Sequence, residues 1–124
     1  MHLCGAVLFV SNLARMREFY AEMLQTPPGG TDYPDSYAVF DLSGDKLFLH
    51  AIPPEYAGEP GAASPTREEN PIKLIFAVEN VASARARLHA IGASILERPW
   101  QNPDESCDAV DPEGNVFQIA VGRR

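Results

Sequence analysis

Apolar and polar positions follow an order that occurs twice along the chain. An apolar run over residues 4–10 is followed by apolar residues at helical spacing over residues 13–24. The same two patterns return over residues 72–78 and 81–91. Runs in which apolar and polar residues alternate close each half, so the pattern predicts a βαβββ unit in each half. Two or three further strands are expected in the first half, around residues 31–33, 36–42 and 46–52, and three in the second, near residues 94–98, 106–111 and 115–121.

The two halves are also similar residue by residue. VSNLA, which begins at Val10, aligns with VENVA at Val78, and DLSGD at Asp41 aligns with DPEGN at Asp111. The first pair is offset by 68 residues and the second by 70. An internal repeat of this kind predicts a pseudo-symmetric domain, and the surface between two such modules is a natural place for a ligand.

Capping and breaking residues set the expected boundaries. Ser11 or Asn12 can cap the first helix and Asn80 the second. The stretch Pro53–Pro71 contains five prolines and few large apolar residues, so it reads as a linker or flap. We therefore expect a single domain over residues 1–124, with module one at about 1–52, the linker at 53–71 and module two at about 72–124.

Composition narrows the class of protein. A net charge of −7 without a basic run argues against nucleic acid and anionic membrane surfaces as partners. The N-terminal residues lack the pattern of a signal peptide, and no apolar stretch approaches the length of a membrane span. The two cysteines, Cys4 and Cys107, are far apart and fit a reduced protein. Cytoplasmic localisation is the expectation.

Three segments resemble the vicinal oxygen chelate superfamily, which includes glyoxalase I, bleomycin-resistance proteins, fosfomycin-resistance enzymes and extradiol dioxygenases. They are VLFVSNLARMREFYAEMLQ, FAVENVASARARLHAIGA and the closing DAVDPEGNVFQIAV. In the last, Asp111 should cap backbone amides and Gly114 should adopt a left-handed conformation. The resemblance implies an α+β fold in which two pseudo-symmetric βαβββ modules form a glyoxalase-like curved sheet around a cavity.

The resemblance also implies a divalent metal held by His and Glu, but the matching positions do not carry these residues. They are Gly5, Phe48, Lys73 and Gln118. Glycine and phenylalanine cannot ligate, lysine is a cation, and glutamine offers only a neutral oxygen. We therefore expect no metal and no other cofactor, and no catalytic residue is assigned.

Side chains on the same strand faces form the predicted ligand site. Lys73 and Gln118 can recognise an anionic or carbonyl-bearing ligand, although each can instead pair with a nearby carboxylate or solvent. His50 can bind a ligand or transfer protons, or can be a partly exposed strand histidine. The full set expected to line one cavity is Phe9, Phe48, His50, Lys73, Trp100 and Gln118.

Three functions are compatible with this pattern. The first is a cytoplasmic protein, similar to the bleomycin-resistance branch, that binds a small organic molecule in the cavity between modules without a metal. The second is a metal-dependent lyase or dioxygenase of the glyoxalase type with atypical ligands such as His50 and Gln118. The third is a degenerate member that acts through protein association. A homodimer is expected, with residues 53–71 and the Trp100 loop as candidate contacts.

Overall fold

The computed structural model describes residues 1–57 and 64–122. The chain forms two compact units, Met1–Ala63 and Ser64–Arg124, which we call unit 1 and unit 2 and describe separately. Residues 58–63 of the predicted linker lie outside the described residues. Of the rest of that stretch, Pro54–Tyr56 forms a 3-10 helix and Arg67 forms an isolated parallel bridge with Asn115.

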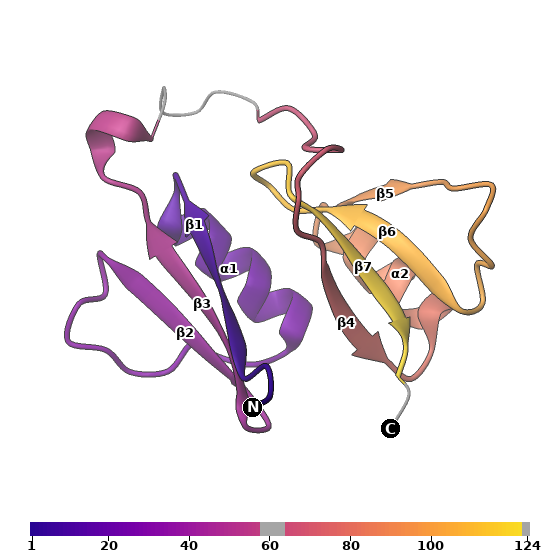
Figure 1. Cartoon of the computed structure of the whole chain (residues 1–124), viewed down its shortest axis with the longest axis horizontal. Coiled ribbons are helices and arrows are strands. Elements are labelled where there is room, and N and C mark those ends of the chain that lie inside the picture. The colour runs from indigo at the N-terminus through magenta and orange to yellow at the C-terminus, as the bar shows by residue number, and fades with distance from the viewer. Residues whose placement is uncertain (58–63, 123–124) are drawn as a thin grey trace. The chain divides into compact units, whose positions relative to one another are not determined.

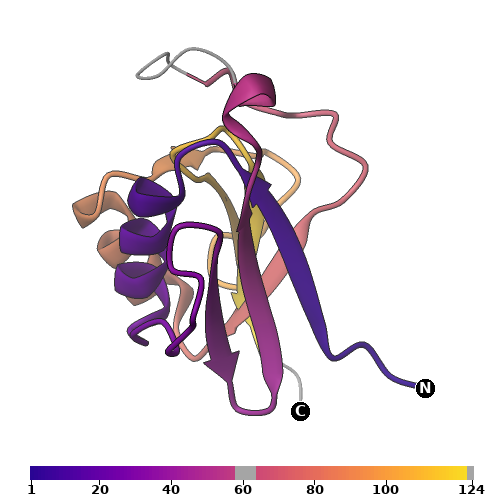
Figure 2. The same cartoon turned by 90° about the vertical axis from the view of Figure 1, so that its left-hand side faces the viewer.

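Unit 1 is a three-stranded sheet with one helix. It contains β1 (Gly5–Val10), α1 (Leu13–Leu24), β2 (Tyr37–Leu42) and β3 (Asp45–Ala51). The order in the sheet is β1-β3-β2, with β1 parallel and β2 antiparallel to β3. The helix α1 packs on one face of this sheet (Figure 1, Figure 2). The helix residues buried there are Leu13, Met16, Phe19, Tyr20 and Met23.

Unit 2 repeats this arrangement with one more strand. It contains β4 (Leu74–Val78), α2 (Val81–Ala90), β5 (Ser94–Leu96), β6 (Ser106–Val110) and β7 (Val116–Val121). The order is β4-β7-β6-β5, with β4 parallel and β6 antiparallel to β7. The helix α2 again lies on one face of its sheet (Figure 1).

Strand register confirms the internal repeat. Val7 of β1 lies opposite Phe48 of β3, and Ile75 of β4 lies opposite Gln118 of β7. These pairs are related by the two offsets found in the sequence. In both units the first strand therefore pairs in parallel with the last, and the α+β fold with repeated modules is as predicted.

Both helices begin at asparagine caps: Asn80 as predicted, and Asn12, one of the two residues considered for the first helix. The Asn12 side chain accepts from the Arg15 amide at 3.1 Å, and Asn80 accepts from the Ser83 amide at 2.8 Å. The second helix ends before Gly92, whose φ of 90° is left-handed. The helices are 12 and 10 residues long, and within the described residues no helix could cross a bilayer.

The predicted strand over residues 31–33 is wrong, so unit 1 is a βαββ unit. Pro27, Pro28 and Pro34 flank this stretch and have no amide hydrogen to give to a ladder. The Gly29 amide donates to the Val39 carbonyl at 2.7 Å. The segment therefore lies beside β2 without joining the sheet.

The turn before β7 forms as predicted. An Asp111 carboxylate oxygen accepts from the backbone amides of Glu113 and Asn115 at 2.9 and 3.0 Å. Gly114 has a φ of 85°, and a Cβ there would lie 2.0 Å from the Pro65 carbonyl oxygen. Only glycine fits this position, because both the conformation and the space exclude a side chain.

Each sheet has one buried face under its helix and one opposite face, which we call the open face. In unit 2 the buried face carries Phe117 and Ile119 from β7 and Ala109 from β6. Successive strand residues point to opposite faces. Asp108 and Gln118, which are Cα partners on β6 and β7, therefore lie together on the open face.

Candidate functional site

A buried carboxylate is the centre of the candidate site. Asp108 has only 1% of its surface exposed, although it lies on the open face of unit 2. Burial of an ionised carboxylate is costly unless charged or polar donors compensate it. Its neighbours must therefore supply those donors.

Three side chains converge on Asp108. The Lys73 Nζ and the Arg98 Nε donate to the same oxygen, Oδ2, at 3.0 and 3.3 Å. The Gln101 Nε2 donates to Oδ1 at 2.9 Å. Lys73 lies just before β4, whereas Arg98 and Gln101 lie in the loop between β5 and β6. The carboxylate thus ties two separate segments to the sheet.

These contacts keep Asp108 ionised. Burial alone would raise the pKa of Asp108, but the hydrogen bonds from Lys73 and Gln101 and the charge of Lys73 outweigh it, so the pKa lies below its ordinary value of 3.8. Arg98 is held as a cation in the same way, because its hydrogen bond to Glu68 raises its pKa.

Arg98 makes a second set of contacts besides its hydrogen bond to Asp108. The Arg98 Nη2 donates to the Glu68 Oε2 at 2.8 Å. The guanidinium carbon lies 5.6 Å from the centre of the Trp100 ring, a cation–π distance, and 75% of Trp100 is exposed. Arg98 therefore joins a buried carboxylate, a loop carboxylate and an exposed aromatic ring.

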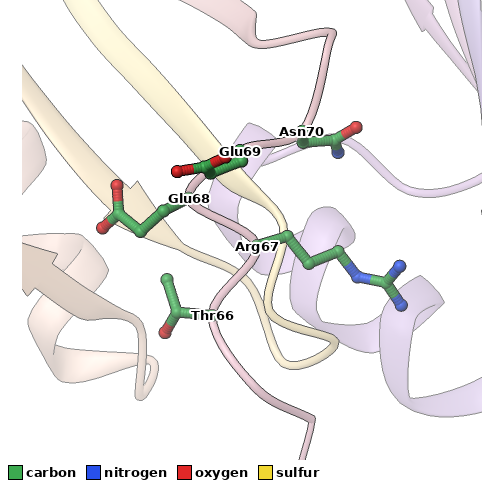
Figure 3. Close-up of a pocket in the computed structure, with 5 residues that line it drawn as sticks. All are labelled: Thr66, Arg67, Glu68, Glu69 and Asn70. Atoms are coloured by element: carbon green, nitrogen blue, oxygen red, sulfur yellow. The ribbon is translucent and has the colours of Figure 1, made fainter.

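Glu68 also borders a small pocket. The pocket has a volume of about 400 Å³, and Figure 3 shows the five residues that line it. They are Thr66, Arg67, Glu68, Glu69 and Asn70. These residues belong to the segment that precedes β4. The Glu68–Arg98 pair therefore connects this segment to the side chains around Asp108.

The structure places three of the predicted site residues in this part of unit 2. Lys73 contacts Asp108, Gln118 is the Cα partner of Asp108, and Trp100 contacts Arg98. For Lys73, the pairing with a carboxylate that we considered as the alternative is what the structure shows. Its side chain is nevertheless 44% exposed, and an ammonium has three donors. It can therefore hold Asp108 and still bind a ligand.

The other three predicted residues lie together on the open face of unit 1. Phe9 and His50 are Cα partners, and their ring centroids are 5.6 Å apart. Phe48 lies two residues before His50 on the same face of β3. Phe9 is 65% exposed, and the His50 Nδ1 lies 3.1 Å from the Ala51 carbonyl oxygen. A single cavity lined by all six residues stays a prediction.

The residues at the positions where the resemblance implies metal ligands do not fit a metal. Lys73 carries a positive charge and is paired with Asp108. A Cβ on Gly5 would lie 2.5 Å from the Lys46 carbonyl oxygen, so the local backbone has no room for a ligating side chain there. Among the described residues, no three His, Cys, Asp or Glu side chains gather closely enough to hold an ion.

Sequence reasoning missed the residues that organise the cluster, namely Asp108, Arg98, Gln101 and Glu68. One signal was available for Asp108. It interrupts the apolar pattern of SCDAV, and strand parity places it on the same face as Gln118. No comparable signal identifies its partners, because they come from loops.

Comparison with known proteins agrees with this fold. Residues 5–120 match the family described as glyoxalase-like domain. No curated protein is significantly similar in sequence to the chain. Several solved structures are similar in fold.

The fosfomycin resistance protein FosX from Listeria monocytogenes superposes with a TM-score of 0.71 at 15% identity, covering 96% of this chain and 89% of FosX. Glyoxalase I from Leishmania major gives a TM-score of 0.66 at 18% identity, covering 98% of this chain and 86% of that enzyme. An integron cassette protein of Vibrio cholerae gives 0.70 at 20% identity, covering 99% and 96%. The TM-scores establish the fold, and the family match over residues 5–120 confirms the resemblance to the vicinal oxygen chelate superfamily.

Proposed function

Because the chain belongs to the family of glyoxalase-like domains, we propose that it binds a small organic molecule without the family's usual metal. The ligand carries a carbonyl or carboxylate group and binds at the open face of unit 2, where Lys73 and Gln118 lie. Phe9, Phe48 and His50 belong to the same proposal as further ligand contacts. The proposal also includes a cytoplasmic homodimer.

The orientation of Lys73 carries this proposal. Asp108 is almost fully buried and fixes one side of the ammonium, while the exposed part keeps donors that a ligand oxygen can use. A flexible lysine bound in this way loses less side-chain freedom when a ligand arrives. The residues at the metal positions support a ligand held by hydrogen bonds and charge instead of by coordination.

The test is binding to Lys73→Met, which keeps the apolar stem and removes the charge. A library of small carboxylates and carbonyl compounds is screened by thermal shift, and the hits are titrated by calorimetry. Because Lys73 is partly exposed, we expect the affinity of an anionic hit to fall about tenfold, the lower part of the range for a charge-assisted bond. Lys46→Met is the matched control, since Lys46 is the other lysine of the chain and is not paired with Asp108.

Other results would favour the alternatives. Equal loss of affinity in both variants would reject a specific role for Lys73. Stoichiometric metal in the purified protein would favour a lyase or dioxygenase with atypical ligands. The absence of any hit, together with capture of a defined protein partner, would favour a role in protein association.

A further inference from the structure

The guanidinium of Arg98 already holds two carboxylates that come from the chain itself. Its Nε donates to Asp108 and its Nη2 donates to Glu68. The two acceptors differ in burial, because Asp108 is buried whereas the Glu68 side chain is 47% exposed. Arg98 itself is 16% exposed. The contact of Arg98 with the buried Asp108 is therefore fixed, whereas the contact with the exposed Glu68 can be broken and replaced by another.

The segment that carries Glu68 is anchored by its neighbour. The Arg67 amide donates to the Gly114 carbonyl at 2.7 Å, and the Arg67 Nε donates to the Glu113 carbonyl at 3.3 Å. Figure 3 shows that the side chains of Arg67 and Glu68 leave the segment on opposite sides. Glu68 can thus move away from Arg98 by side-chain rotation while the Arg67 contacts persist.

The surroundings of the Arg98–Glu68 contact fit a planar anion. A guanidinium binds carboxylates through two parallel hydrogen bonds, and an aromatic plane binds flat apolar groups by stacking. Trp100 supplies such a plane directly beside Arg98 and is largely exposed. Lys73 adds a second cation close by, because it and Arg98 bind the same oxygen of Asp108.

We propose that Arg98 and Trp100 form a subsite for an aromatic carboxylate, and that Glu68 occupies this subsite until the ligand displaces it. This inference rests on the proposed function and names the class of ligand that the open face of unit 2 takes. Glu68 acts as an internal competitor, so it lowers the apparent affinity for the ligand.

The exposure of Glu68 sets the size of the expected effect. Ion pairs of this exposure are weak, so the state in which Glu68 is bound to Arg98 is populated only moderately more than the state in which it is not. Removing the competing charge should therefore tighten binding about two- to sixfold. The direction is the informative part, because loss of a surface carboxylate that had no such role would leave the affinity nearly unchanged.

The experiment uses sodium benzoate as the probe, with benzamide as its neutral counterpart, at constant ionic strength. Trp100 is the single tryptophan of the chain, so its fluorescence reports on this subsite directly. Benzoate should quench or shift the emission with saturation in the millimolar range or below, and benzamide should not. Glu68→Gln should bind benzoate more tightly than the wild type. Glu69→Gln is the matched control, because it removes the same charge from the next residue of the same pocket.

Arg98→Lys tests the cation. It keeps a positive charge for Asp108 but loses the planar fork, so benzoate binding should weaken about tenfold while the urea midpoint changes little. The inference is overturned if Glu68→Gln and Glu69→Gln bind benzoate equally, if benzamide binds as well as benzoate, or if benzoate binds to neither the wild type nor Glu68→Gln. The proposed function fails separately, when no hit of the ligand screen depends on Lys73.

Discussion

Replacement of Asp108 by asparagine tests the central contact of the site. The amide keeps the size of the carboxylate but replaces one acceptor with a donor. It then faces the donors of Lys73, Arg98 and Gln101. At least one of these donors then has no acceptor, and the position is buried, since Asp108 is only 1% exposed. Asp108→Asn should therefore destabilise the protein even though it adds no volume.

The structure also sets the magnitude of this effect. A hydrogen bond to a charged acceptor contributes about 1.5–3 kcal/mol when it is buried. The contact with Lys73 counts for less, because that side chain is 44% exposed and screened by solvent. We expect the free energy of unfolding to fall by about 2–4 kcal/mol. In urea this corresponds to a midpoint lower by about 1–2 M.

The measurement is urea unfolding followed by Trp100 fluorescence and by circular dichroism. Asp104→Asn is the control, because Asp104 is exposed, lies in the loop just before β6 and makes the same change in net charge. A midpoint for Asp108→Asn that equals that of Asp104→Asn would refute the reasoning, since the buried network would then contribute nothing to stability.

The pH dependence gives an independent check. The pKa of Asp108 lies below 3.8 in the folded protein, so the folded state binds fewer protons there than the unfolded state. Its stabilisation is therefore present above about pH 4 and is lost as the pH falls through the lower, folded value. The difference in stability between the wild type and Asp108→Asn should shrink below pH 4. A difference that stays constant down to pH 3 would contradict the assignment.

Other predictions concern the turn, the metal and the assembly. Gly114→Ala should destabilise the protein by about 2–4 kcal/mol in urea unfolding, because the new Cβ meets the Pro65 carbonyl at a left-handed φ, whereas Gly30→Ala meets nothing within 4 Å and should be neutral. Elemental analysis of protein purified without chelators should find far less than one equivalent of Zn, Ni, Fe or Mn, and a full equivalent would reject a metal-free site. Sedimentation velocity at micromolar concentration should give the mass of a dimer, and a monomer throughout would remove that part of the proposal.

The elements were predictable where local signals agreed with one another. The first helix has the predicted bounds, because Asn12 caps it and the prolines at 27 and 28 follow its end. The stretch over residues 31–33 had no such agreement. Its residues have strand-like character, but the flanking prolines remove amide donors that a ladder needs. Here the lack of backbone donors, and not the pattern of side chains, decided that no strand forms.

The candidate site was predictable only in part, because its residues come from different kinds of structure. Lys73 and Gln118 could be placed by strand parity and the repeat. Their connection through Asp108 could not, since Arg98 and Lys73 lie 10 and 35 residues from Asp108 in loops or at strand ends. Loop conformation is not encoded in apolar periodicity. A buried aspartate in an apolar strand could have indicated that cations lie nearby, but not which ones.

The pairing of first and last strands has a consequence for synthesis. In unit 2, β7 lies between β4 and β6, so neither of those strands has its central partner until residues 116–121 have been made. During translation β4 must wait with unpaired backbone groups while more than thirty residues follow it. Pairing across such a separation is slow, and exposed strand edges promote aggregation. A chain that ends before residue 116 would therefore lack the inner strand that joins β4 to β6, which makes the completion of β7 the committing event for unit 2.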